Sequence, residues 1–83
     1  MTTKEITEKV MSAIEYVSKV GNMPVYNSIV KNHKKGYKPA KDFVKKVVEK
    51  IELGEINSNI DLINHLTNIK LTEIIPYTYS RYK

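Results

Sequence analysis

The chain has 83 residues, a net charge of +5, no cysteine and 41% hydrophobic residues. This composition excludes a disulfide framework, a thiolate metal site and a disordered chain, and the length leaves room for one hydrophobic core. No apolar run reaches the roughly 20 residues that cross a bilayer, and the start lacks the apolar stretch of a secretory signal. We therefore expect one cytoplasmic domain over residues 1–83.

The first predicted element is a helix that begins at Thr2 and ends near Gly21. Thr2 and Glu5 have the spacing of a capping box, and Gly21 with Asn22 offers a left-handed residue that can end a helix. Between them, hydrophobic residues recur every three or four positions, at Ile6, Val10, Ala13, Ile14, Val17 and Val20.

A second helix is predicted between Pro24 and Gly36. Proline suits a first helical turn, because its missing N–H has no intrahelical partner there. The helical spacing continues through Val25, Tyr26, Ile29, Val30 and His33. A strand is the alternative, since β-branched residues are frequent, but an alternating period fits poorly.

Pro39 opens a third predicted helix, which ends before Gly54. Its hydrophobic residues follow the positions of one amphipathic face: Ala40, Phe43, Val44, Val47, Val48 and Ile51. Lysines lie opposite this face and at its border, so one side of the helix is apolar and the other strongly basic.

Ser58 and Asp61 form an N-cap pair that predicts a fourth helix, ending near Lys70. Its hydrophobic residues are Ile60, Leu62, Ile63, Leu66 and Ile69. Residues 76–83 are expected to form an extended aromatic tail, because the segment after Pro76 is too short and too polar for a core element. The predicted fold is all-α, a compact bundle of three to four short helices.

The positive charge is concentrated between Lys31 and Lys50. This segment holds eight lysines against Asp42 and Glu49, a net charge of +6, whereas the other 63 residues sum to −1. A concentrated basic segment predicts contact with a phosphate backbone, with release of condensed counterions. The candidate nucleic-acid-binding residues are Lys31, Lys34, Lys35, Lys38, Lys41, Lys45, Lys46 and Lys50.

An ordinary solvated helix surface is the alternative explanation for these lysines. Such surfaces usually alternate both signs of charge at i,i+4, whereas Lys41–Lys45 and Lys34–Lys38 are like-charged pairs at that spacing. With one arginine in the chain, base-specific reading of guanine edges has little to work with. We therefore expect binding with little sequence specificity.

The last seven residues interleave aromatic and basic side chains. Tyrosine rings stack on unpaired bases and neighbouring cations hold the backbone, which suits single-stranded RNA or DNA better than a duplex groove. Of the two, we expect RNA rather than DNA as the ligand. Packing of these tyrosines on the core, or against a protein, is the alternative. The further candidate nucleic-acid-binding residues are Tyr77, Tyr79, Arg81, Tyr82 and Lys83.

A less favoured variant is a helix-turn-helix formed by the third and fourth helices. Its reading helix would point Asn59, Asn64, His65 and Asn68 outward. Asp61 would then meet phosphate at the start of that helix, which argues against the arrangement.

Catalysis, metal binding and a bound cofactor are not expected. His33 and His65 lack any zinc-binding spacing, and the chain has no Gly-rich phosphate loop or nucleophile elbow. His33 is expected instead to cap the end of the second helix, where the helix dipole favours a cation.

Small size and abundant isoleucine, asparagine and lysine resemble the small accessory proteins of T4-like phages, some of which inhibit host toxins or polymerase. The resemblance covers size and residue usage, with no matching motif, so no functional residue is carried over. It implies the host cytoplasm as location.

The leading hypothesis is a small RNA-binding adaptor or inhibitor. The alternative is a protein-interaction module that docks its basic helix on an acidic host enzyme or toxin. Homodimerisation would cover apolar surface left by a modest core. Membrane attachment is disfavoured, because the apolar face of the third helix is aliphatic with a single Phe and no Trp.

Overall fold

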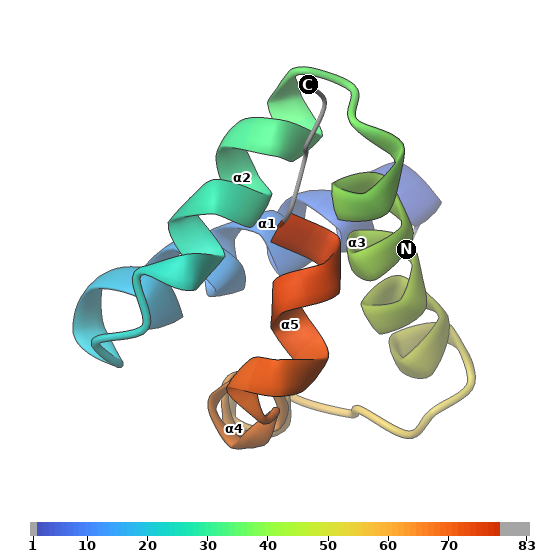
Figure 1. Ribbon diagram of the computed structural model, residues 1–83. Helices are drawn as coiled ribbons and strands as arrows, with labels where there is room; N and C mark the ends of the chain where they lie inside the picture. The colour runs from blue at the N-terminus through green and yellow to red at the C-terminus, as the bar shows by residue number, and fades with distance from the viewer. Residues whose placement is uncertain (1, 79–83) are drawn as a thin grey trace.

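The computed structural model describes the backbone of residues 2–78, and the side chains of residues 2–70 and 72–75. Five helices make up this part of the chain (Figure 1). They are α1 (Thr3–Val20), α2 (Val25–Lys34), α3 (Lys38–Glu52), α4 (Asn59–Asn68) and α5 (Leu71–Thr78). Residues 2–78 contain no strand, so the predicted all-α fold is confirmed. None of these helices is both long and apolar enough to cross a membrane.

Helices α2 and α3 lie between α1 on one side and α5 on the other. α1 contacts α2, α3 and α4, whereas α5 contacts α2 and α3. Figure 1 shows α5 in front of the α2–α3 pair and α1 behind it, with α4 at the lower edge. The α2–α3 pair is therefore supported on both faces.

The predicted helix boundaries are confirmed where capping residues specify them. The Thr2 hydroxyl accepts a hydrogen bond from the Glu5 N–H at 3.2 Å, and the Glu5 carboxylate accepts one from the Thr2 N–H at 2.9 Å. The Ser58 hydroxyl accepts from the Asp61 N–H at 3.1 Å. After α1, the left-handed residue is Asn22, with φ 55°. These local interactions fix where α1 and α4 begin and where α1 ends.

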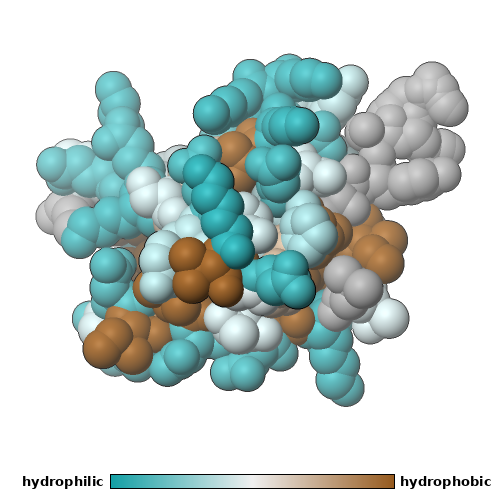
Figure 2. Space-filling view, turned by 90° about the vertical axis from the view of Figure 1, so that its left-hand side faces the viewer, coloured by the Kyte–Doolittle hydropathy of each residue, from teal (hydrophilic) through white to brown (hydrophobic). Residues whose placement is uncertain are grey.

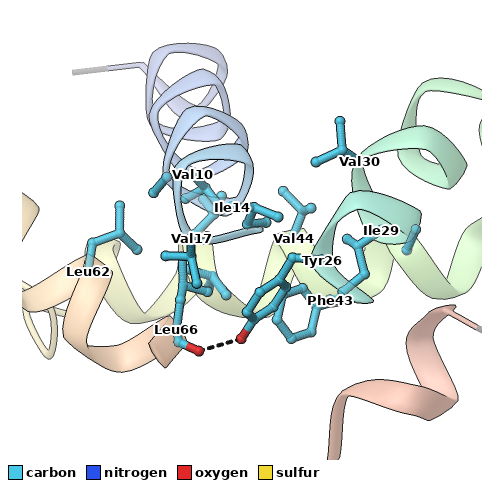
Figure 3. Close-up of a cluster of buried hydrophobic side chains, with 14 of the residues drawn as sticks. Val10, Ile14, Val17, Tyr26, Ile29, Val30, Phe43, Val44, Leu62 and Leu66 are labelled. Atoms are coloured by element: carbon cyan, nitrogen blue, oxygen red, sulfur yellow. Dashed lines mark hydrogen bonds between the residues drawn. The ribbon is translucent and has the colours of Figure 1, made fainter. Parts of the chain in front are cut away.

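The core combines the apolar faces of all five helices. Figure 3 shows the part of the core that α1, α2, α3 and α4 contribute. Among the described side chains, no charged residue is buried. The fully buried side chains include Val10, Ile14, Val17, Tyr26, Ile29, Val44, Val47, Leu66 and Ile74.

Tyr26 connects three helices through this core. Its hydroxyl donates a hydrogen bond to the Leu66 carbonyl at 2.5 Å, and its ring lies 6.0 Å from that of Phe43. Leu66 is in the last turn of α4, where carbonyls have no intrahelical donor. Burial raises the pKa of the Tyr26 phenol, so this group remains a donor. The tyrosine thus satisfies a backbone acceptor that the helix end leaves open.

Helix α5 corrects the prediction of an extended tail from Pro76. The backbone of residues 76–78 belongs to α5, and residues 79–83 lie outside the described part of the chain. Pro76 is the sixth residue of α5 and cannot donate the bond that would reach the Thr72 carbonyl. Ile74 is fully buried, in a helix packed against α2 and α3. Tertiary burial therefore outweighs the cost of a proline in this short helix.

The helix-turn-helix variant is wrong. α4 packs along α1, and its backbone does not approach that of α3. His65 is half-buried in the structure, whereas the variant required it to face outward. A Gly-bearing turn between two helices does not determine which helix the second one packs against.

Replacing Tyr26 by Phe should destabilise the fold without creating a cavity. The Leu66 carbonyl would lose its buried donor, and an unsatisfied buried polar group costs about 1–3 kcal/mol. Urea denaturation of the Tyr26→Phe variant measures this loss. Tyr16→Phe is the matched control, because Tyr16 is 50% exposed and its hydroxyl reaches water. Equal unfolding free energies for the two variants would contradict the proposed role of the Tyr26 hydroxyl.

Candidate nucleic-acid interface

Six lysines surround the junction of α2 and α3, and all six are exposed. We call them the basic surface: Lys31, Lys34, Lys35, Lys38, Lys41 and Lys45. Within residues 31–45 the only acidic residue is Asp42, so six positive charges against one negative charge give +5. The rest of the chain has eight basic and eight acidic residues, which cancel. The net charge of the whole protein therefore equals that of this one region.

A tight turn brings the end of α2 against the start of α3. Gly36 has φ 85°, a backbone conformation that glycine adopts at low cost. The next amide, that of Tyr37, donates to the Asn32 carbonyl at 3.0 Å and closes the turn. Lysines from the last turns of α2 thus lie beside those from the first turns of α3.

The other two predicted lysines, Lys46 and Lys50, lie on the opposite flank of α3. They line a separate groove of about 450 Å³ with Phe43, His65 and Glu73. The Lys50 ammonium also pairs with the Glu55 carboxylate at 3.3 Å. The structure thus places six of the eight predicted lysines around the α2–α3 junction and the other two beside a second groove. A turn of about 100° per residue separates the two flanks of the helix.

The first flank of α3 borders a groove that we call the α1–α3 groove. It has a volume of about 420 Å³. Its floor is Val44 and Val48, and its lining comes from three helices. The polar residues around it are Thr3 and Thr7 of α1, His33 of α2, and Lys38, Lys41, Asp42 and Lys45 of α3.

His33 does not have the cationic capping role that its position predicted. Its side chain is half-buried in the α1–α3 groove. Burial first, and the nearby Lys41 ammonium second, lower the pKa of this imidazole below its ordinary value. The neutral form is therefore favoured at neutral pH, and neutral imidazole offers one donor and one acceptor.

The lysines of the basic surface differ in whether they form an ion pair. The Lys38 ammonium contacts the Asp42 carboxylate at 3.0 Å, in a pair whose side chains are 83% and 44% exposed. Such an exposed pair contributes little to stability. Among the described residues, Lys41 and Lys45 form no ion pair. These two ammonium groups are available to an external anion.

Sequence reasoning overlooked Tyr37. It lies between Lys35 and Lys38, and 37% of its surface is exposed. An aromatic residue within a Lys-Lys-Gly-Tyr-Lys run was the available signal. Of the predicted C-terminal residues, Tyr77 has its backbone in α5, whereas Tyr79, Arg81, Tyr82 and Lys83 lie outside the described residues.

The face that carries the outer side of α2 is mainly hydrophilic (Figure 2). Its hydrophobic residues form small separate groups between hydrophilic ones. Among the described side chains, no group of three His, Asp or Glu residues could hold a metal ion. The chemistry of the described interface is therefore that of ammonium groups, an imidazole and one tyrosine ring.

Stability should fall as the pH decreases from 7 to 5. His65, like His33, has a pKa lowered by burial; the Lys50 ammonium lowers it further and the Glu55 carboxylate opposes this. In the unfolded chain these histidines have an ordinary pKa of about 6.5. They therefore bind protons at pH values where the histidines of the folded chain stay neutral. The free energy of unfolding is therefore highest above the histidine pKa of the unfolded chain, about 6.5, and declines as the pH falls below it.

Urea denaturation at several pH values measures the decline. The His33→Gln, His65→Gln double variant should show a flatter dependence between pH 7 and 5. An equally steep decline in that variant would assign the effect to other groups.

No protein family, curated protein or solved structure matches this chain. The geometry and charge of the basic surface, and of the groove beside it, are therefore the observations that bear on function.

Proposed function

We propose that the protein binds nucleic acid through the basic surface, with single-stranded RNA preferred, and holds it as an adaptor or inhibitor. The observation that carries the proposal is the concentration of the entire net charge in six exposed lysines at one helix junction. A polyanion that reaches this end of the molecule meets several ammonium groups together. Release of counterions then drives the association.

The position of these lysines on α3 supports a binding role over a stabilising one. The first turn of α3 contains no acidic residue, and Lys38 is its first residue. The positive end of a helix dipole disfavours cations there by about 0.3–1 kcal/mol each. The same dipole attracts a phosphate. In the isolated protein the Asp42 carboxylate already holds the Lys38 ammonium, so Lys41 is the lysine near this helix start whose charge a bound anion would offset.

The types of residue indicate the kind of nucleic acid. Lysine acts as a mobile point charge and reads few base edges, so we expect little sequence specificity. The tyrosines that alternate with Arg81 and Lys83 at the C-terminal end of the sequence offer rings for stacking on unpaired bases. Duplexes keep their bases stacked inside, which favours single strands as ligands.

Removing two charges from the basic surface should weaken RNA binding. For Lys34→Gln with Lys35→Gln, we expect about tenfold lower affinity for a single-stranded RNA, and a salt dependence shallower by about 1.4 in log–log slope. Fluorescence anisotropy between 50 and 200 mM salt measures both quantities. The matched control is Lys19→Gln with Lys70→Gln, which removes the same charge from exposed positions outside the basic surface.

Equal losses in the test and control variants would contradict the proposed surface. A wild-type affinity that stays constant over this salt range would contradict nucleic-acid binding itself. The protein-interaction alternative is favoured by a different result. In that case RNA is not bound, and the wild type and the control variant capture an acidic protein from a nuclease-treated lysate, whereas the Lys34, Lys35 variant does not.

Replacing Asp42 by Asn should strengthen binding. Asp42 is the only acidic residue in the basic surface region, and its carboxylate holds the Lys38 ammonium. The change raises the local charge from +5 to +6 and releases one lysine. We expect a severalfold higher affinity and a salt slope steeper by about 0.7, with stability changed by less than about 1 kcal/mol. Glu15→Gln, at an exposed position of α1, is the charge-matched control.

A further inference from the structure

The α1–α3 groove differs chemically from the rest of the basic surface. The lysines of α2 and the turn are exposed, whereas Lys41 and Lys45 border a groove that also contains a half-buried imidazole. We propose that this groove is the binding site for one phosphate group of the nucleic-acid backbone, held by Lys41 and Lys45 and by an N–H of His33. The proposal rests on the proposed function and names one contact within it.

Asp42 is the carboxylate that lines the groove, and it accepts from the Lys38 ammonium at 3.0 Å. The Thr3 hydroxyl donates to the Glu52 carboxylate, which is not part of the groove lining, at 3.1 Å. The Thr7 hydroxyl donates to the Thr3 carbonyl at 2.8 Å. Both threonine protons are therefore used internally, and the cationic side chains are the donors that remain for a phosphate.

The third proposed donor is the His33 imidazole, whose charge depends on pH. The charged groups that line the groove with His33 are Lys38, Lys41, Asp42 and Lys45 of α3, while α1 contributes two uncharged threonines. In the unliganded protein, burial and Lys41 lower the pKa of His33 and favour neutral imidazole. A phosphate between the lysines offsets their charge and accepts a hydrogen bond from imidazolium. Binding at this site should therefore take up a proton.

The first experiment uses inorganic pyrophosphate and the full chain. Histidine ring signals in NMR, recorded from pH 5 to 8, report each imidazole separately. Pyrophosphate should raise the pKa of His33 and leave that of His65 unchanged, because His65 lies in the groove on the other flank of α3. An equal shift of both histidines, or the same shift with chloride at matched ionic strength, would overturn the site.

The second experiment uses a ten-nucleotide single-stranded RNA at constant salt. Wild-type affinity should rise at least threefold between pH 7.5 and 5.5. The His33→Gln variant should lose this rise, and the His65→Gln control should keep it. Lys41→Gln with Lys45→Gln should weaken binding more than the Lys19, Lys70 control, with folding checked by circular dichroism. A His33→Gln variant that keeps the full pH dependence would overturn the inference.

Different results would contradict phosphate binding in the α1–α3 groove and RNA binding by the basic surface. If Lys34 and Lys35 are required for RNA binding while Lys41, Lys45 and His33 are not, the groove is excluded and the basic surface stands. If the wild-type protein binds no RNA, the proposed function fails. The pyrophosphate titration then still decides whether the groove takes phosphate.

Discussion

The hydrogen bond from Tyr26 to the Leu66 carbonyl is the constraint on which the rest of the fold depends. α4 packs along α1 and has no backbone contact with α2 or α3. The tyrosine extends from α2 past Phe43 of α3 to reach the end of α4 (Figure 3). Because its donor and the carbonyl are both removed from water, the core tolerates few alternative arrangements of these helices. One side chain thus specifies the relative positions of α2, α3 and α4.

This core also determines the geometry of the basic surface. α1 and α5 hold the α2–α3 pair from opposite sides, so the end of α2 and the start of α3 keep a fixed relation (Figure 1). The contact between Tyr26 of α2 and Phe43 of α3 joins the two helices in the core. The lysines themselves are flexible, but the helices that carry them are not. Under the proposed function, a rigid junction would lower the entropy lost when several ammonium groups bind one strand.

Local signals predicted four helices because capping pairs and apolar periodicity act within a few residues. Thr2 with Glu5 and Ser58 with Asp61 form the bonds that their spacing indicated. Helix α5 was missed because Pro76 normally ends a helix and the segment is stabilised by tertiary burial. The grooves on the two flanks of α3 and the depressed pKa of His33 also depend on neighbouring helices. Neither can be derived from the sequence of α2 or α3 alone.

α3 differs from most of the other helices in the charge of the residues in its first turn. α1, α4 and α5 each carry an acidic residue in the first turn, as the helix dipole favours. α3 has none there and begins with a lysine, whereas the last turn of α2 carries Lys31 and Lys34. Cations at the C-terminal end of α2 are favoured by the helix dipole. Fold stability therefore explains the positive charge in the α2 half of the junction. In the reversed half, on α3, the Asp42 carboxylate holds the Lys38 ammonium at 3.0 Å, and under the proposed function a phosphate would offset the positive charge that remains.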